Sequence, residues 1–329
     1  MNSSVKHILF ITSNRIGDAV LSSGLLDYIA RVYPSARVTV ACGPLVVSLF
    51  EGYPQLERII PLQKRKRHGH WVDLWKSVVP VRWDMVVDLR NSAVSRLIRA
   101  RLRFVFGPHI DQGNHKVEQM AQVMNLSDVP APRLWFTAAQ MEKAAVLIPD
   151  GGPVLGVGPS ANWEGKMWPA ERFAEIVRWM TGADGLMPGA RVAVFGAPGE
   201  EEAARAVLER VPDGRGIDVI AKGNPGEAAA ALARCSFYLG NDSGLMHCAA
   251  AAQVPVLGLF GPSKPQVYRP WGPLAFYVST PESLDELTSY EGYDSRTCGC
   301  LMETLGVGDV QQALMRAFEE NEPKKKIPA

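Results

Sequence analysis

Short apolar runs alternate with amphipathic stretches along almost the whole chain, and this alternation constrains the fold more than any other feature. Each apolar run is followed by a stretch in which apolar residues recur every three to four positions, the period of a helix that packs on one side. Strands that alternate with helices in this way form a parallel sheet with helices covering it. The sequence therefore predicts an α/β fold of the doubly wound type.

The pattern occurs twice. We first expect strands within HILFITS, RVTVACG, RIIPL, DMVVDL and FVFG, and helices within GLLDYIARVY, HWVDLWKSVV and SAVSRLIRAR. A Pro/Gly connection near residue 150 leads into a second series, beginning with PVLGVGP and PAERFAEIVRWM. The 329 residues also exceed what one core usually supports. We predict two Rossmann-like domains, 1–150 and 151–329, the second ending in a C-terminal helix, with a ligand cleft at the carboxyl ends of the strands.

Composition narrows the class of protein. No apolar run reaches the roughly 20 residues of a membrane span, and the first one is too short and interrupted for a secretory signal. The five cysteines are an odd number without a paired framework, which fits a reducing compartment. We therefore expect a cytoplasmic protein without disulfides. The pair Cys298 and Cys300 has no second pair at ligand spacing, so free thiols are favoured over a zinc site.

Positive charge is concentrated in the first third of the chain. The net charge of +1 argues against general nucleic-acid binding, yet KRKR at 64–67 is followed by five arginines between residues 90 and 103. If SAVSRLIRARLR is helical, Arg96, Arg99 and Arg103 lie on one stripe. We expect Arg96 and Arg99 to bind an anionic acceptor or an anionic membrane surface. A solvated surface is the alternative.

The sequence NDSG at 241–244 follows a strand and opens an alanine-rich helix. The first turn of a helix has unpaired N–H groups and the positive end of the dipole, so it can bind a phosphate. Ser243 adds a hydroxyl, Gly244 lets a ligand approach the backbone, and His247 lies on the same helical face. Helix capping by Asp242 and Ser243 is the alternative, and it needs no ligand.

From Asn241 to Ser263 the spacing resembles that of the ADP-heptose:lipopolysaccharide heptosyltransferases, glycosyltransferase family 9. Three further segments of the chain resemble the same family: 8–40 (ILFITSNRIGDAVLSSGLLDYIARVYPSARVTV), 158–176 (GPSANWEGKMWPAERFAEI) and 194–209 (VFGAPGEEEAARAVLE). The resemblance covers most of residues 7–318 and is weakest from about 60 to 135. It implies the GT-B fold: an acceptor-binding Rossmann-like domain and a donor-binding one that face a cleft.

The resemblance also implies roles for particular residues. Asp18 would be the general base that deprotonates the acceptor hydroxyl, although a helix-start aspartate gives the same local sequence. Lys166 would balance charge on the leaving diphosphate. One of Glu200, Glu201 and Glu202 would bind the donor ribose, and we choose Glu201. Relative to shorter versions in the family, two residues are inserted in the loop after Gly158, so Ser160 and Asn162 compete for one hydroxyl or amide role, and we choose Ser160. The donor-binding residues are then Ser160, Lys166, Glu201, Gly223, Asp242, Ser243, Gly244 and His247.

The resemblance implies an inverting glycosyltransferase that moves heptose, or a related sugar, from an ADP-sugar to a lipopolysaccharide core or similar glycan acceptor. A lipid-linked or phosphorylated acceptor would place the enzyme at the inner face of the cytoplasmic membrane. No Asp-x-Asp motif lies in a fitting turn, so we expect no metal and no other cofactor. Two alternatives stay open: a non-catalytic nucleotide-sugar-binding module, and a dinucleotide-dependent oxidoreductase, for which SNRIGDAV has only one glycine of G-x-G-x-x-G.

Overall fold

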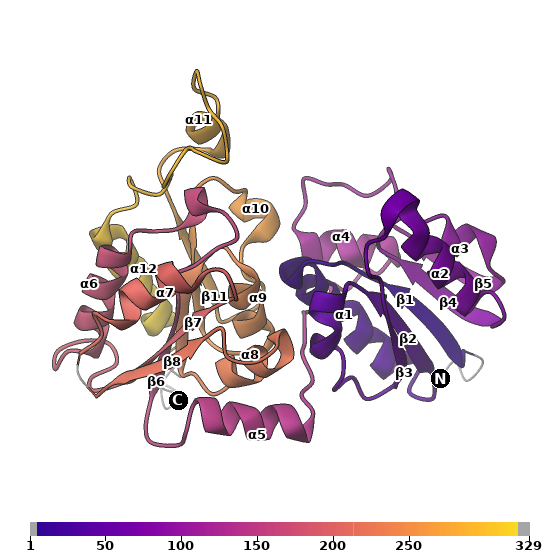
Figure 1. Ribbon diagram of the computed structural model, residues 1–329, viewed down its shortest axis with the longest axis horizontal. Coiled ribbons are helices and arrows are strands. Elements are labelled where there is room, and N and C mark those ends of the chain that lie inside the picture. The colour runs from indigo at the N-terminus through magenta and orange to yellow at the C-terminus, as the bar shows by residue number, and fades with distance from the viewer. Residues whose placement is uncertain (1–4, 213, 322–329) are drawn as a thin grey trace, which may run out of the picture. The chain divides into compact units, whose positions relative to one another are not determined.

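Two compact units make up the chain in the computed structural model, which describes residues 5–212 and 214–321 (Figure 1). The first unit comprises residues 1–144 with 223–230, and the second comprises 145–222 with 231–329. The contacts therefore divide the chain at residues 144 and 145 and assign a short later segment to the first unit.

The first unit contains a five-stranded parallel sheet in the order β3-β2-β1-β4-β5. β1 lies at its centre, where Phe10 is in register with Val40 of β2 and Val87 of β4. The strand order reverses between β1 and β4, which is where open sheets of this kind usually bind ligands. The strands are β1 (His7–Ile11), β2 (Arg37–Cys42), β3 (Leu56–Pro61), β4 (Trp83–Asp88) and β5 (Ala100–Val105).

Helices connect or follow these strands. They are α1 (Ile16–Val32), α2 (Gly69–Val78), α3 (Val94–Leu97) and α4 (Lys116–Val123), with 3-10 turns η1 (Pro44–Leu49) and η2 (Lys66–His68). α5 (Ala138–Leu147) and α8 (Pro225–Leu232) each cross a boundary between the units.

The predicted helix over SAVSRLIRAR is wrong beyond its first turn. α3 ends at Leu97, and Ala100–Val105 instead forms β5, which pairs with β4. Arg103 lies on this strand and donates hydrogen bonds to the carbonyls of Ser95, Ile98 and Ala100. Pairing with a neighbouring strand has overridden the local helical period. Arg96, Arg99 and Arg103 therefore do not form one helical stripe.

The second unit contains a six-stranded parallel sheet in the order β11-β10-β9-β6-β7-β8. Its strands are β6 (Val154–Gly158), β7 (Arg191–Gly196), β8 (Gly216–Ile220), β9 (Phe237–Asn241), β10 (Val256–Phe260) and β11 (Ala275–Ser279). The helices and turns are η3 (Glu164–Lys166), α6 (Ala170–Thr181), α7 (Glu201–Leu208), α9 (Gly244–Ala251), α10 (Pro265–Tyr268), α11 (Leu284–Thr288) and α12 (Val307–Asn321). The predicted α/β fold with two doubly wound sheets is confirmed.

The core of the second unit explains why its strands are nearly continuous apolar runs. β6, β9 and β10 are buried along their whole length, as expected of parallel strands covered on both faces. α12 packs on β10, β11 and α6 and buries Leu314 and Ala317. Within the described residues, no helix is long and apolar enough to cross a membrane.

Candidate functional site

Because all strands of the second sheet are parallel, the loops that follow them leave the sheet on one side, at the carboxyl ends of the strands, which we call the carboxyl edge. The segment after β6 contains Ser160 and Lys166, the segment after β7 contains Glu200, and Asp242 and Ser243 follow β9 directly. Residues predicted from separate parts of the sequence therefore meet at this edge.

An ion pair joins two of these loops. The Nζ of Lys166 lies 2.5 Å from Oδ2 of Asp242, and the two side chains are only 23% and 8% exposed. Lys166 is the last residue of η3, and Asp242 lies between β9 and α9. An ion pair with so little contact with water is screened much less than a surface pair. It holds a cation beside the first turn of α9.

Asn241 fixes both ends of the loop that carries Lys166. Its Nδ2 donates to the carbonyl of Pro159 (2.7 Å), and the N–H of Trp168 donates to its Oδ1 (3.2 Å). Asn241 is fully buried, so both bonds are shielded from water. Trp168 is buried as well and donates through Nε1 to the carbonyl of Leu305. The loop is therefore clamped where it leaves β6 and where it enters α6.

The start of α9 has the properties of an anion site. Ser243 is the N-cap residue, yet its side chain makes no capping hydrogen bond. Its Oγ is buried, without a partner in hydrogen-bond geometry among the described residues, and the same holds for the Oγ of Ser263 after β10 and the hydroxyl of Tyr238. Buried hydroxyls are rarely left in this state. Phosphate oxygens at this edge would supply acceptors for the two serines.

Tyr238 lies beneath this site, and two glycines make room for it. A Cβ at Gly158 or at Gly240 would collide with the Tyr238 hydroxyl. Burial raises the pKa of Tyr238; the Ser243 hydroxyl lies close enough to offset that effect in part, although the two hydroxyls do not meet in hydrogen-bond geometry. The phenol therefore stays protonated next to Ser243 over the physiological pH range.

Of the three adjacent glutamates, Glu200 lies closest to the predicted donor loop. The Oγ of Ser160 donates to Oε2 of Glu200 at 2.7 Å, and Ser160 is buried. Glu201, the residue chosen from the sequence, accepts a hydrogen bond from Gly199 in its own turn, and Glu202 is exposed. These contacts favour Glu200 over Glu201 as the glutamate that binds the donor ribose. The role of Glu201 stays a prediction.

A later segment rests on the loop that carries Lys166. Trp163 donates through Nε1 to the carbonyl of Ser295 (2.5 Å), and the N–H of Leu301 donates to the carbonyl of Gly165 (3.2 Å). The thiol of Cys300 donates to the carbonyl of Met167 (3.1 Å). Cys300 thus takes part in packing the loop, and burial raises the pKa of its thiol.

Asp18 lies in the first unit, in the first turn of α1 and close to the end of β1. The Oγ of Ser13 donates to its Oδ2 at 3.4 Å, and the carboxylate is half-buried. Arg90, which follows β4, donates to Oδ1 of Asn14 in the same β1 to α1 loop (2.9 Å). Asp18 thus lies at the carboxyl end of β1, beside the loop that Arg90 contacts.

The structure does not bring all predicted residues together. Gly223 belongs to the segment that clusters with the first unit; it has a positive φ of 92°, and a Cβ there would collide with Glu227. His247 is buried one turn along α9 from Ser243. Arg96 donates to the Ser92 carbonyl and to the Asn91 side chain. Arg99 is exposed just before β5.

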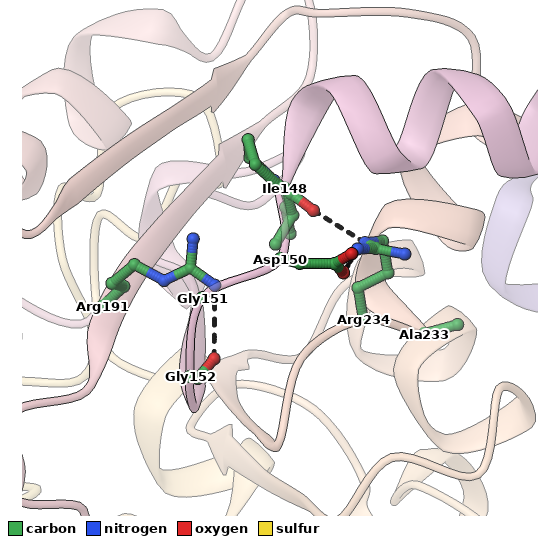
Figure 2. Close-up of a pocket in the computed structure, with 8 residues that line it drawn as sticks. Ile148, Asp150, Gly151, Gly152, Arg191, Ala233 and Arg234 are labelled. Carbon is green, nitrogen blue, oxygen red and sulfur yellow. Dashed lines mark hydrogen bonds and ion pairs between the residues drawn. The ribbon is translucent and has the colours of Figure 1, made fainter.

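A hollow of about 390 Å³ lies at the amino ends of strands of the second sheet, and Figure 2 shows residues that line it. It lies at the beginning of β6 and β7, where Arg191 donates to the carbonyl of Gly152, and Arg234 donates to the carbonyl of Ile148 and pairs with Asp150. Both arginines thus hold the segment 148–152 against the rest of the second unit. This hollow is separate from the candidate site.

Sequence reasoning assigned no role to Asn241, Tyr238 or Ser263. A signal for Asn241 was present, since it is the single polar amide at the end of an otherwise apolar buried strand. Tyr238 could not be found in this way, because its position depends on two glycines from different strands.

The sequence and the fold are similar to those of known proteins. The family model described as glycosyltransferase family 9 (heptosyltransferase) matches residues 94–291. Lipooligosaccharide heptosyltransferase 2 of Haemophilus influenzae is 24% identical over 308 residues, covering 80% of this chain and 86% of the relative. A solved family 9 glycosyltransferase from Veillonella parvula superposes with a TM-score of 0.79 at 22% identity, covering 96% and 98% of the two chains. An E. coli heptosyltransferase solved with ADP superposes with a TM-score of 0.71 at 18% identity, covering 94% of this chain and 99% of that one.

Proposed function

The chain belongs to glycosyltransferase family 9, and on that premise we propose that it transfers heptose, or a related sugar, from an ADP-sugar to a lipopolysaccharide core or similar glycan acceptor. The names of its relatives support heptose as the sugar, and the E. coli structure with ADP supports an adenine nucleotide. Membership of the family sets aside the oxidoreductase alternative.

One observation carries the donor assignment. At the start of α9, the buried Ser243 hydroxyl caps nothing, and the Lys166 ammonium group lies beside Asp242. The first amides of a helix have no intrahelical acceptor and carry partial positive charge. Amides, a hydroxyl and an ammonium group together suit the oxygens of a diphosphate.

The proposed reaction is a single displacement with inversion. The acceptor oxygen attacks the anomeric carbon as its proton passes to Asp18, and the bond from that carbon to the diphosphate breaks. Negative charge then develops on the leaving diphosphate, where Lys166, Ser243 and the amides from Gly244 onward stabilise it. Positive charge develops at the anomeric carbon.

We propose that transfer needs no metal ion. A leaving diphosphate requires positive charge, and Lys166 with the first turn of α9 supplies it from the protein itself. Transfer that continues at full rate in a chelator would agree with this. Transfer that stops in the chelator and returns with Mg²⁺ would contradict it.

We further propose that the acceptor is lipid-linked and that the protein works at the inner face of the cytoplasmic membrane. The lipopolysaccharide and lipooligosaccharide named for its relatives support this. The exposed arginines Arg96 and Arg99 support contact with an anionic acceptor. Both units are needed for transfer, because Asp18 and the donor loops belong to different ones.

The decisive experiment is calorimetric titration with ADP, ADP-heptose and UDP-sugars, using the wild type, Lys166→Ala and Ser243→Ala. We expect selective binding of the ADP ligands, weakened at least about tenfold by Lys166→Ala, which corresponds to about 1.4 kcal/mol. Folded protein that binds none of these ligands would refute the donor assignment.

Asp18→Asn then separates an enzyme from a binding module. We expect this variant to bind ADP-heptose like the wild type and to lose transfer by a factor of about 100 or more. Unchanged transfer would show that Asp18 is not the base.

A further inference from the structure

Three exposed apolar side chains of the first unit lie where α2 meets α3. Leu97 is 64% exposed, Val72 49% and Trp75 37%. Trp75 donates through Nε1 to the carbonyl of Leu97 at 3.4 Å, and the two helices pack together, as Figure 1 also shows. Val72 and Trp75 are three positions apart on α2 and therefore share one face. Lys76, four positions after Val72, extends the same face.

The chain around these side chains is strongly basic. Residues 62–103 contain eleven lysines and arginines and three aspartates, a net charge of +8 in a chain whose total is +1. All eleven cations are exposed. They are Lys64, Arg65, Lys66, Arg67, Lys76, Arg82, Arg90, Arg96, Arg99, Arg101 and Arg103.

The three aspartates of this segment already have partners. Asp73 pairs with Arg65 at 2.5 Å, Asp84 accepts hydrogen bonds from the amides of Lys6 and His7, and Asp88 is buried and accepts from Ser92. Apart from Arg65, which pairs with Asp73, and Arg101, whose charge acts on Asp84, the positive charge of this segment is available to an external anion.

We propose that the α2–α3 surface, formed by Val72, Trp75 and Leu97 with Lys64, Lys66 and Lys76, docks the protein onto an anionic lipid bilayer. The proposal deepens the proposed function and rests on it, since a lipid-linked acceptor lies in such a bilayer. Tryptophan and aliphatic side chains enter the headgroup boundary, while lysines attract anionic headgroups. A nucleic acid would satisfy the charges but would leave the apolar side chains in water.

Cosedimentation with vesicles tests this surface. We expect the full chain to bind vesicles containing about one third phosphatidylglycerol and to bind pure phosphatidylcholine at least about tenfold more weakly. Each lysine near an anionic surface strengthens binding about fivefold, or about 1 kcal/mol. Lys64→Gln/Lys66→Gln/Lys76→Gln should therefore weaken binding by roughly 100-fold, and salt should weaken the wild type.

Apolar variants separate docking from simple charge attraction. Trp75→Ser/Leu97→Ser should bind the anionic vesicles at least about tenfold more weakly. Met141→Ser/Val146→Ser removes two apolar side chains of α5 that are 54% and 73% exposed and should bind like the wild type. Because Trp75→Ser also removes a hydrogen bond, Val72→Ser is a second test, with an expected loss of a few-fold. Thermal unfolding confirms that each variant is folded.

Two results would overturn the proposal. One is wild-type vesicle binding by both Trp75→Ser/Leu97→Ser and Val72→Ser. The other is displacement of the protein from vesicles by duplex DNA at an equal charge concentration. ADP titration of the same preparations keeps the two proposals distinguishable. Vesicle binding without ADP binding refutes the donor assignment alone, and ADP binding without vesicle binding refutes the docking surface alone.

Discussion

The ammonium group of Lys166 lies 2.5 Å from a carboxylate oxygen of Asp242, although 76 residues separate them in the sequence. The pair connects the loop after β6 with the start of α9. A lysine already held by the protein is oriented before a diphosphate arrives, so less conformational freedom is lost on binding.

Removing one partner of this pair should destabilise the protein. Lys166→Met leaves the carboxylate of Asp242 mostly buried and without its cation, and we expect a loss of about 1–3 kcal/mol in the free energy of unfolding, the usual cost of a buried group left unsatisfied. Lys166→Met/Asp242→Asn should recover part of that loss. The measurement is denaturant unfolding of both variants. The control is Lys222→Met, which breaks the more exposed pair with Asp218 and should change stability by less than about 1 kcal/mol.

Asn241 should affect nucleotide binding through the loop that it clamps. Asn241→Leu leaves the carbonyl of Pro159 and the amide of Trp168 buried without partners, at a cost of about 1–3 kcal/mol each. We expect ADP affinity to fall at least about tenfold. Asn241→Asp keeps the acceptor for Trp168 but cannot donate to Pro159, so its effect should be intermediate.

A control separates this positioning effect from general destabilisation. Thr181→Val removes the buried bond from Thr181 to the Val177 carbonyl in α6, in the same unit. It should lower the melting temperature and leave ADP affinity unchanged. If Thr181→Val and Asn241→Leu weaken ADP binding equally, Asn241 has no specific role in positioning the loop.

The choice between two neighbouring glutamates can be made by calorimetry. We expect Glu200→Gln to lower ADP affinity several-fold more than Glu201→Gln, because Glu200 is bonded to buried Ser160 whereas Glu201 bonds within its own turn. 2′-Deoxy-ADP is the matched ligand, because it lacks the 2′-hydroxyl of the ribose. If a glutamate binds that hydroxyl, its replacement by glutamine should weaken the binding of ADP but not that of 2′-deoxy-ADP. The reverse order of affinities would favour Glu201.

Asp84 should make the stability of the first unit depend on pH. Burial alone would raise the pKa of its carboxyl, but hydrogen bonds from the amides of Lys6 and His7 and the charge of Arg101 lower it below the ordinary 3.8. A group with a lowered pKa stabilises the fold above its unfolded pKa, and this contribution disappears as the pH falls through the folded value.

We therefore expect the melting temperature of the wild type to fall between about pH 5 and pH 3, and to fall less in Asp84→Asn. Asp128→Asn, at an exposed aspartate, should follow the wild type. Parallel pH curves for the wild type and Asp84→Asn would exclude a contribution from Asp84.

Much of the fold could be predicted because its strands are short, apolar and regularly interrupted by amphipathic stretches. Where prediction was wrong, a local period competed with strand pairing: residues 98–103 have helical spacing, yet β5 completes the sheet beside β4. Only the end of β5, Phe104 and Val105, lies within a predicted strand (FVFG), because the exposed arginines before it interrupt the apolar pattern.

For the candidate site, the sequence predicted the residues that carry charge and hydroxyl groups, namely Lys166, Asp242 and Ser243. It did not predict which groups support them. The ion pair, the clamp by Asn241 and the bond between Ser160 and Glu200 each join different loops, and their partners depend on the packing of the whole sheet.

Because Asn241 holds both ends of the loop between β6 and α6, the sheet does not depend on the length of that loop. The two backbone groups that Asn241 holds belong to Pro159 and Trp168, at the two ends of the loop. Between them, Ser160 and Lys166 are bonded to Glu200 and Asp242, and Trp163 and Gly165 contact the later segment 295–301. Residues could therefore be inserted or removed between Ser160 and Lys166 while the strands keep their register. This loop is thus a natural place for protein engineers to graft segments of different length and redirect donor preference.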